Sequence, residues 1–312
     1  MAGESIQAGK LITVDWGTSN FRAALLDDAG EILDRIQAPK GLLQLEKGML
    51  ASTLTELLAP WLSALPDTPL LMAGMIGSAE GLVEVPYLEC PASLDDMAQA
   101  LAPVPELEGH RQAYIVPGLR GRSMSGNHDV MRGEEIQILG ALQGTKPDAQ
   151  TFCLPGTHSK WVSLEGRRVM TFSTCMTGDV YAALRSHTLL KRYTTQGEHD
   201  PQAFRQGLAQ TDQPGGLLHH LFSARTEVLL GDLPPQASAA YLSGLLIGSE
   251  VHAMVDALKP QGTVTLIANR QLTALYADAL DARGVNTRCI DGDAAAIAGL
   301  HHLATHADLI RN

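Results

Sequence analysis

The sequence lacks the features that mark membrane, secreted and zinc-binding proteins. No stretch approaches the roughly 18 consecutive apolar residues that a membrane-spanning helix requires. The first residues, MAGESIQ, have no basic segment followed by an apolar one, so we expect no secretory signal and a cytoplasmic location. The four cysteines are far apart, which argues against a disulfide framework or a zinc site.

The sequence also has no basic run. Its 23 Lys and Arg residues are dispersed among 34 Asp and Glu residues, and the formal net charge is −11. Nucleic acid and membrane surfaces are therefore excluded as expected partners. An acidic protein that binds an anion must gather a few arginines or amide donors in one place. We expect small-molecule partners and a monomer or homodimer.

One construction occurs twice. In each copy, a buried strand leads to a turn containing Gly-Thr, followed by a second strand, an acidic-Gly turn and a third strand. The copies begin with LITVDWGTSNFR at 11–22 and TFCLPGTHSKW at 151–161. The 312 residues suffice for two domains, and the polar segment 145–149 separates the copies. We therefore predict two related α/β domains, at 1–144 and 145–312, that face each other across a cleft.

Both turns carry groups that suit phosphate. Glycine lets backbone amides approach a ligand, and the neighbouring hydroxyl and amide side chains add donors. The candidate phosphate contacts are Gly17, Thr18, Ser19 and Asn20 in the first turn, and Gly156 and Thr157 in the second, beside His158. An ordinary β-turn would explain each segment separately. It would not explain why both turns stand in the same pattern of flanking strands and turns.

The remaining pattern predicts alternating helices and strands. Helical spacing covers 49–64, 130–143, 179–230, 237–258 and 272–283, and a last helix begins at 293. A buried strand that runs into a glycine-bearing turn is expected at 70–78, and further strands are expected at 113–117, 264–268 and 286–290. The segment 120–128 is rich in Gly, Ser and Arg, so we expect an exposed loop there.

The ordered motifs closely resemble those of the 2-dehydro-3-deoxygalactonokinase family, in the superfamily of sugar kinases, actin and heat-shock chaperone ATPases. They are DWGTSN at 15–20, MAGMIGS at 72–78, VPYLECPA at 85–92, VPGL at 116–119, VMRGEEIQ at 130–137, PGTHSKWV at 155–162, TCMTGD at 174–179 and LSGLLIG at 242–248. The resemblance implies two ribonuclease-H-like domains of the sugar kinase and actin type. It also implies that the last helix returns to the first domain.

The implied activity is ATP- and Mg²⁺-dependent phosphorylation of 2-dehydro-3-deoxy-D-galactonate to its 6-phosphate, in galactonate or galactose breakdown. Two alternatives remain: a kinase for another keto-sugar acid, and a non-catalytic nucleotide switch of the same fold. The resemblance places adenosine at Ala268 and Asn269. Asp15, at the end of the first strand, can hold Mg²⁺ on the nucleotide phosphates. A carboxylate that merely caps the turn is the alternative for Asp15.

The general base has several candidates. The superfamily usually places an acidic base at the start of the helix that joins the domains, or just beyond the second phosphate turn. Those places hold Glu134 with Glu135, and His158. A carboxylate near Mg²⁺ or a histidine would serve at neutral pH. We favour Glu134 and keep Asp129, Glu135 and His158 as alternatives.

The implied substrate is an acid, so its site needs a carboxylate clamp. Arg132 precedes the glutamate pair and can form bidentate hydrogen bonds; Arg22 and Arg185 are weaker candidates. The remaining expected substrate contacts are Glu135, Gly77, Ser78, Thr177, Gly178 and Asp179.

Overall fold

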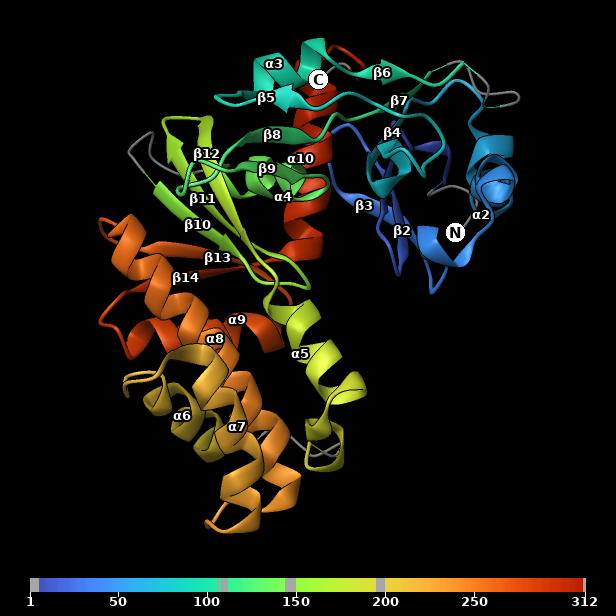
Figure 1. Ribbon diagram of the computed structural model, residues 1–312. Helices are drawn as coiled ribbons and strands as arrows, with labels where there is room; N and C mark the ends of the chain where they lie inside the picture. The colour runs from blue at the N-terminus through green and yellow to red at the C-terminus, as the bar shows by residue number, and fades with distance from the viewer. Residues whose placement is uncertain (1–5, 106, 108–111, 144–149, 195–199, 311–312) are drawn as a thin grey trace. The chain divides into compact units, whose positions relative to one another are not determined.

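The computed structural model describes residues 6–105, 107, 112–143, 150–194 and 200–310. The chain divides into two compact units (Figure 1). Unit 1 comprises Met1–Ala149, Ser163–Phe172 and Ile290–Asn312, and unit 2 comprises Gln150–Val162 and Ser173–Cys289. The domain boundary expected at 144 and 145 lies outside the described residues.

Unit 1 is built on a six-stranded sheet in the order β3-β2-β1-β4-β7-β6. Its strands are β1 (Leu11–Trp16), β2 (Phe21–Leu26), β3 (Ile32–Ala38), β4 (Leu70–Gly74), β6 (Ala102–Pro103) and β7 (Ala113–Ile115). The first three form the predicted antiparallel meander. β4 pairs in parallel with β1, so the carboxyl ends of these two buried strands, with Asp15 and Gly74, lie at the same sheet edge.

A small sheet in unit 1 shows that the prediction of an exposed loop over the whole of 120–128 was wrong. β8 (Leu119–Arg122) and β9 (His128–Met131) form an antiparallel hairpin, and β5 (Leu88–Glu89) pairs with β8. Burial alternates along β8, the period of two that a half-buried strand requires. Arginine and glycine at successive positions concealed this alternation in the sequence. The following helix, expected from 130, begins instead at Glu134.

In the described part of unit 1, the sheets are accompanied by the helices α2 (Leu50–Ala64), α3 (Leu94–Gln99), α4 (Glu134–Ala141) and α10 (Gly292–His306). α2 buries Leu50, Leu54, Leu58 and Trp61, which recur at helical spacing, into the apolar core beside β1 and β4. α10 packs against α4 within this unit. The start of the last helix therefore lies with β1, as contacts between α10 and β1 also show.

The second large sheet has the order β12-β11-β10-β13-β14, which repeats the order β3-β2-β1-β4-β7 of the first. Its strands are β10 (Gln150–Leu154), β11 (Ser159–Glu165), β12 (Arg168–Cys175), β13 (Val264–Ala268) and β14 (Thr287–Asp291). β13 is parallel to β10, as β4 is to β1. The repeated order confirms the two related α/β folds that the paired turns predict.

The helices of unit 2 are α5 (Thr177–His187), α6 (Pro201–Gln210), α7 (Gly216–Leu229), α8 (Ser238–Leu258) and α9 (Arg270–Asp281). α8 contacts the other four helices, and small residues along it allow close packing. Short 3-10 segments connect several elements; they are η1 (Leu42–Gln44), η2 (Lys47–Met49), η3 (Met75–Gly77), η4 (Leu189–Arg192) and η5 (Pro235–Ala237).

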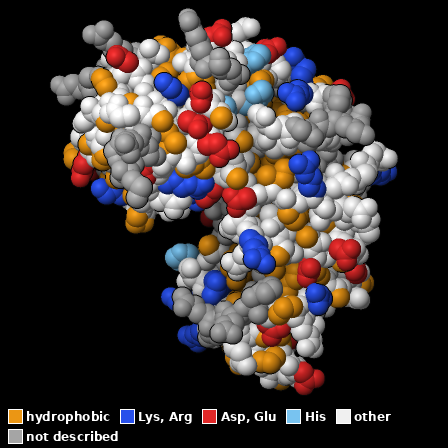
Figure 2. All heavy atoms as spheres, turned by 180° about the vertical axis from the view of Figure 1, so that it is seen from behind, with side chains coloured by type: hydrophobic (Ala, Val, Ile, Leu, Met, Phe, Trp, Pro, Cys, Tyr) orange, Lys and Arg blue, Asp and Glu red, His pale blue; other side chains and the backbone are white. Residues whose placement is uncertain are grey.

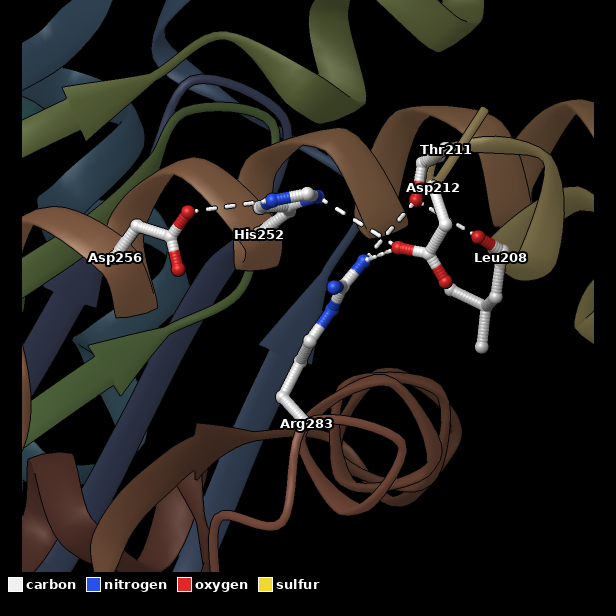
Figure 3. A network of polar contacts seen from close by, with 6 residues as sticks. All are labelled: Leu208, Thr211, Asp212, His252, Asp256 and Arg283. Carbon is white, nitrogen blue, oxygen red and sulfur yellow. Dashed lines mark hydrogen bonds and ion pairs between the residues drawn. The ribbon is translucent and has the colours of Figure 1, made fainter. Parts of the chain in front are cut away.

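Polar contacts join α6, α8 and the end of α9 (Figure 3). Asp212, just after α6, accepts from the Arg283 guanidinium and lies 3.8 Å from His252 Nδ1 on α8. His252 Nε2 lies 3.2 Å from Asp256 Oδ2 one turn further along. These side chains are partly exposed, so each ion pair contributes little to stability alone. Together they tie the ends of α6 and α9 to α8.

Candidate active site

The first Gly-Thr turn follows β1 in unit 1. Gly17 N donates to Asn20 O at 3.0 Å, and Leu42 N donates to Gly17 O at 3.0 Å. The side chains of Thr18, Ser19 and Asn20 are exposed. The turn is therefore closed by its own backbone, anchored to the next segment, and presents polar side chains to the surface.

Asp15 lies directly before this turn, with 22% of its side chain exposed. Its cross-strand partner Arg22 places Nη1 3.7 Å from Asp15 Oδ2 and Nε 3.5 Å from Asp293 Oδ1. Burial raises the pKa of Asp15 to about 6; Arg22 lowers it, while the charges of Asp293 and Glu134 raise it further. The sequence reasoning missed Asp293, because an Asp in the first turn of a helix is ordinarily explained by the helix dipole.

Two glycines with positive φ bring Asp15 and Glu134 into one neighbourhood. A Cβ on Gly74, where φ is 90°, would lie 3.1 Å from Asp15 Oδ1. A Cβ on Gly133, where φ is 106°, would lie 3.3 Å from Gly74 Cα. Since Glu134 follows Gly133 directly at the start of α4, the expected metal carboxylate and the favoured base belong to one cluster in unit 1.

The two glutamates at the start of α4 differ in burial and in hydrogen bonding. Glu134 is partly buried, and its Oε2 accepts from Arg132 N at 3.0 Å. Glu135 is fully buried, and both its carboxylate oxygens accept from Gly133 N, at 2.9 and 2.7 Å. Burial raises the pKa of Glu135 to about 8, and the charge of Glu134 adds to this rise. Asp129, on β9, accepts from the neighbouring Val130 N at 2.8 Å.

Arg132 is held against a neighbouring loop of unit 1. Its guanidinium lies 4.2 Å from the centre of the Tyr87 ring, and its Nη2 donates to Val85 O at 2.7 Å. A Cβ on Gly77 would lie 2.9 Å from Arg132 Nη1, while Ser78 donates its hydroxyl to Met75 O at 2.7 Å. Nε and Nη1 of Arg132 are buried and have no hydrogen-bond partner within the described residues.

The second Gly-Thr turn lies in unit 2, between β10 and β11. Asp179 N donates to Thr157 O at 3.0 Å, so the start of α5 is fixed to the turn. A Cβ on Gly178 would overlap the backbone of Gly156 and Thr157. The expected substrate contacts Thr177, Gly178 and Asp179 therefore lie at the N-terminus of α5, directly beside the second candidate phosphate turn.

His158, the alternative base, points to a carboxylate of the same unit. Its Nε2 lies 3.7 Å from Asp179 Oδ2, and both side chains are about half exposed, at 49% and 50%. This distance is too long for a strong hydrogen bond. The pair can orient the imidazole beside the second turn.

A buried carboxylate that the sequence reasoning missed supports this region. Glu250 of α8 accepts from Trp161 Nε1 at 2.7 Å, from the Tyr276 hydroxyl at 2.7 Å and from the Thr177 hydroxyl. Burial raises the pKa of Glu250, and these hydrogen bonds oppose the rise. Glu250 thereby ties β11, the start of α5 and α9 together, which fixes the frame around the second turn.

A cavity of about 460 Å³ opens next to the second turn within unit 2. Gly156, Thr177, Gly178 and Asn269 contribute to its wall, together with residues of α8 and α9. Ala268 is buried at the end of β13. Asn269 is exposed and caps α9, with its Oδ1 accepting from Leu272 N at 2.9 Å. The expected adenosine segment and the expected phosphate turn thus line one cavity.

The model of the 2-keto-3-deoxy-galactonokinase family matches residues 15–303. The chain belongs to this family. The 2-dehydro-3-deoxygalactonokinase of Escherichia coli strain K12 is 36% identical over 295 residues, which cover 95% of this chain and 97% of that protein. Membership in a kinase family also implies the use of ATP.

Solved structures agree with the 2-keto-3-deoxy-galactonokinase assignment. A crystal structure from Sinorhizobium meliloti, described as a provisional 2-dehydro-3-deoxygalactonokinase, superposes with a TM-score of 0.87 at 34% identity, covering 95% of this chain and 98% of that one. Component A of (R)-2-hydroxyglutaryl-CoA dehydratase from Acidaminococcus fermentans superposes with a TM-score of 0.51 at 11% identity, covering 96% of this chain and 98% of that one. The second likeness concerns the fold alone, which is that of sugar kinases and actin-like ATPases.

Two further observations concern the distribution of charge on the surface and the apolar character of the helices. On the face shown in Figure 2, Lys and Arg side chains are scattered among acidic, apolar and neutral groups. Among the described helices, not one combines the length and apolar character needed to span a membrane.

Proposed function

We propose that this protein is a cytoplasmic, ATP-dependent kinase that converts 2-dehydro-3-deoxy-D-galactonate to its 6-phosphate in galactonate or galactose breakdown. The observation that carries the proposal is the family match over 15–303, which includes every candidate site residue. The geometry of each unit supports particular roles for these residues.

The residues around Asp15 fit a magnesium ion. Mg²⁺ prefers oxygen ligands and is commonly bound by one or two carboxylates while it keeps several waters. Asp15 is a partly exposed carboxylate beside the first Gly-Thr turn, with Asp293 nearby. The 3.7 Å contact with Arg22 is too long to be a strong hydrogen bond, so Arg22 does not lock the carboxylate. Bound there, the ion would neutralise charge on the transferring phosphoryl group.

Glu134 is the base that the geometry favours. It is partly exposed at the start of α4, and it shares a cluster with Asp15 through Gly74 and Gly133. We assign it to accept the proton from the C6 hydroxyl of the sugar acid. Glu135 is fully buried and bound to Gly133 N, so we assign it to hold the loop before α4 and not to contact the substrate.

Arg132 is our candidate for the substrate carboxylate. A buried guanidinium with two unpaired donors is costly, and a carboxylate is the acceptor that satisfies it best. Both donors are shielded from solvent by the segments that carry Gly77 and Tyr87. We therefore infer that these segments shift when the acid binds.

We assign nucleotide binding to residues of unit 2. Gly156 and Thr157, with the N-terminus of α5, suit phosphates, because helix N-termini favour anions. Since Thr177 and Gly178 line the same cavity as Gly156, we assign them to the nucleotide and not to the sugar acid. Ala268 and Asn269 lie where this assignment places adenosine. His158 with Asp179 would orient the phosphate chain.

The test is a panel of ADP-release assays with MgATP and 2-dehydro-3-deoxygalactonate, its epimers, related keto-sugar acids and common hexoses. The proposal predicts rapid ADP release with 2-dehydro-3-deoxygalactonate and slow release without sugar. Faster turnover of another acid would reassign the substrate within the kinase class. Slow, sugar-independent hydrolysis across the panel would favour the nucleotide switch.

A further inference from the structure

Among the described residues that line the cavity in unit 2, one charged side chain has no role in the proposed function. This side chain is Arg185, on the second half of α5, and it lines the cavity together with Tyr181, Ser243 and Gln271. α5 contacts α8 within the same unit, and residues of both helices contribute to the cavity wall.

Tyr181 holds the Arg185 guanidinium in place. The guanidinium carbon lies 5.1 Å from the centre of the Tyr181 ring, and Nη1 donates to the Tyr181 hydroxyl at 3.3 Å. That hydroxyl in turn donates to Ala239 O, at the start of α8, at 3.3 Å. Arg185 Nε is buried and, within the described residues, has no hydrogen-bond partner. A planar cation is thus oriented by an aromatic ring while part of its hydrogen-bonding capacity remains unused.

The position of Arg185 along α5 separates it from the phosphate turn. Gly178 contacts the backbone of Gly156 and Thr157. Arg185 comes seven residues later, about 10 Å further along the helix axis. The Tyr181 side chain lies between these two ends. A nucleotide whose phosphates lie at the turn would therefore present its base, and not its phosphates, to Arg185.

We propose that Arg185 binds the nucleobase of the nucleotide, with the face of its guanidinium stacked on the base. This inference rests on the proposed use of ATP. The planar, weakly hydrated guanidinium suits such stacking, which the ammonium of lysine does not reproduce. We expect the loss of such a stacking contact to weaken binding roughly tenfold, which corresponds to about 1.4 kcal/mol.

The test is a displacement assay in which bound, fluorescent methylanthraniloyl-ADP is displaced by each of four probes. The probes are ADP, GDP, adenosine and inorganic tripolyphosphate. Arg185→Met keeps length and removes charge and planarity, while Arg185→Lys keeps charge alone. Arg192→Ala, at an exposed arginine of η4, is the matched control. We expect Arg185→Met and Arg185→Lys to lower the affinity for ADP, GDP and adenosine roughly tenfold. The affinity for tripolyphosphate should remain unchanged. The control should match the wild type for every probe.

The ratio of ADP to tripolyphosphate affinity is measured within one preparation, so partial misfolding does not alter it. Equal weakening of ADP and tripolyphosphate would make Arg185 a phosphate ligand and overturn the inference. Unchanged affinities for all four probes would overturn it as well. If the wild-type protein binds no nucleotide at all, the proposed function fails, and this inference fails with it.

Discussion

Replacing Glu135 by Gln should make the protein more stable at alkaline pH. Glu135 is fully buried, and burial raises the pKa of its carboxyl from the usual 4.5 to about 8. Below pH 4.5 the folded and unfolded chains both carry the proton. Between 4.5 and 8 the unfolded chain ionises while folded Glu135 stays protonated, so the wild type loses stability as pH rises. Gln mimics the neutral acid and does not ionise.

The size of the effect follows from the pKa difference. At 1.36 kcal/mol for each unit, the full penalty is on the order of 5 kcal/mol, and about 3 kcal/mol of it develops between pH 5.5 and 8.5. Urea unfolding followed by circular dichroism at these two pH values, for the wild type and Glu135→Gln, measures the difference. Glu84→Gln, at an exposed carboxylate of the same unit, is the control. If the unfolding free energies of wild type and Glu135→Gln change in parallel with pH, the reasoning about Glu135 is refuted.

Four further substitutions test the assigned roles. Asp15→Asn should lower kcat by on the order of 10² or more and leave the fold intact, since it removes the charge proposed to hold Mg²⁺; near wild-type turnover at saturating Mg²⁺ would exclude that role. Glu134→Gln should lower kcat by on the order of 10²–10⁴ with little change in KM for ATP, and His158→Asn should have a milder effect; the reverse order would make His158 the base. Arg132→Lys should raise KM for the sugar acid more than it lowers kcat, with no such change for the corresponding neutral sugar alcohol, whereas proportional losses for both would point to a structural role.

The elements around the two turns could be predicted because their signals are local. β-Branched and apolar runs bounded by Gly-Thr and acidic-Gly turns give strands, and α2 buries residues at the spacing that its sequence shows. The β8–β9 hairpin was missed because arginine, histidine and aspartate occupy several of its exposed or half-buried positions, and these residues are also common in loops.

Burial of charged side chains could not be predicted in the same way. Glu135 and Glu250 stand in helical segments where a carboxylate is usually exposed, yet tertiary packing buries both. Asp293 approaches Arg22 only because the last helix packs in the first unit, a contact between residues 271 positions apart. Contacts of this kind depend on the whole fold and leave no local pattern.

Product identification by ³¹P nuclear magnetic resonance and mass spectrometry tests the central claim most directly. The protein is incubated with MgATP and 2-dehydro-3-deoxy-D-galactonate, with Asp15→Asn in parallel. We expect the wild type to yield ADP and a sugar-acid phosphomonoester coupled to the C6 protons, and Asp15→Asn to yield almost none. The account is contradicted if the wild type forms only ADP and inorganic phosphate, or leaves both substrates unchanged.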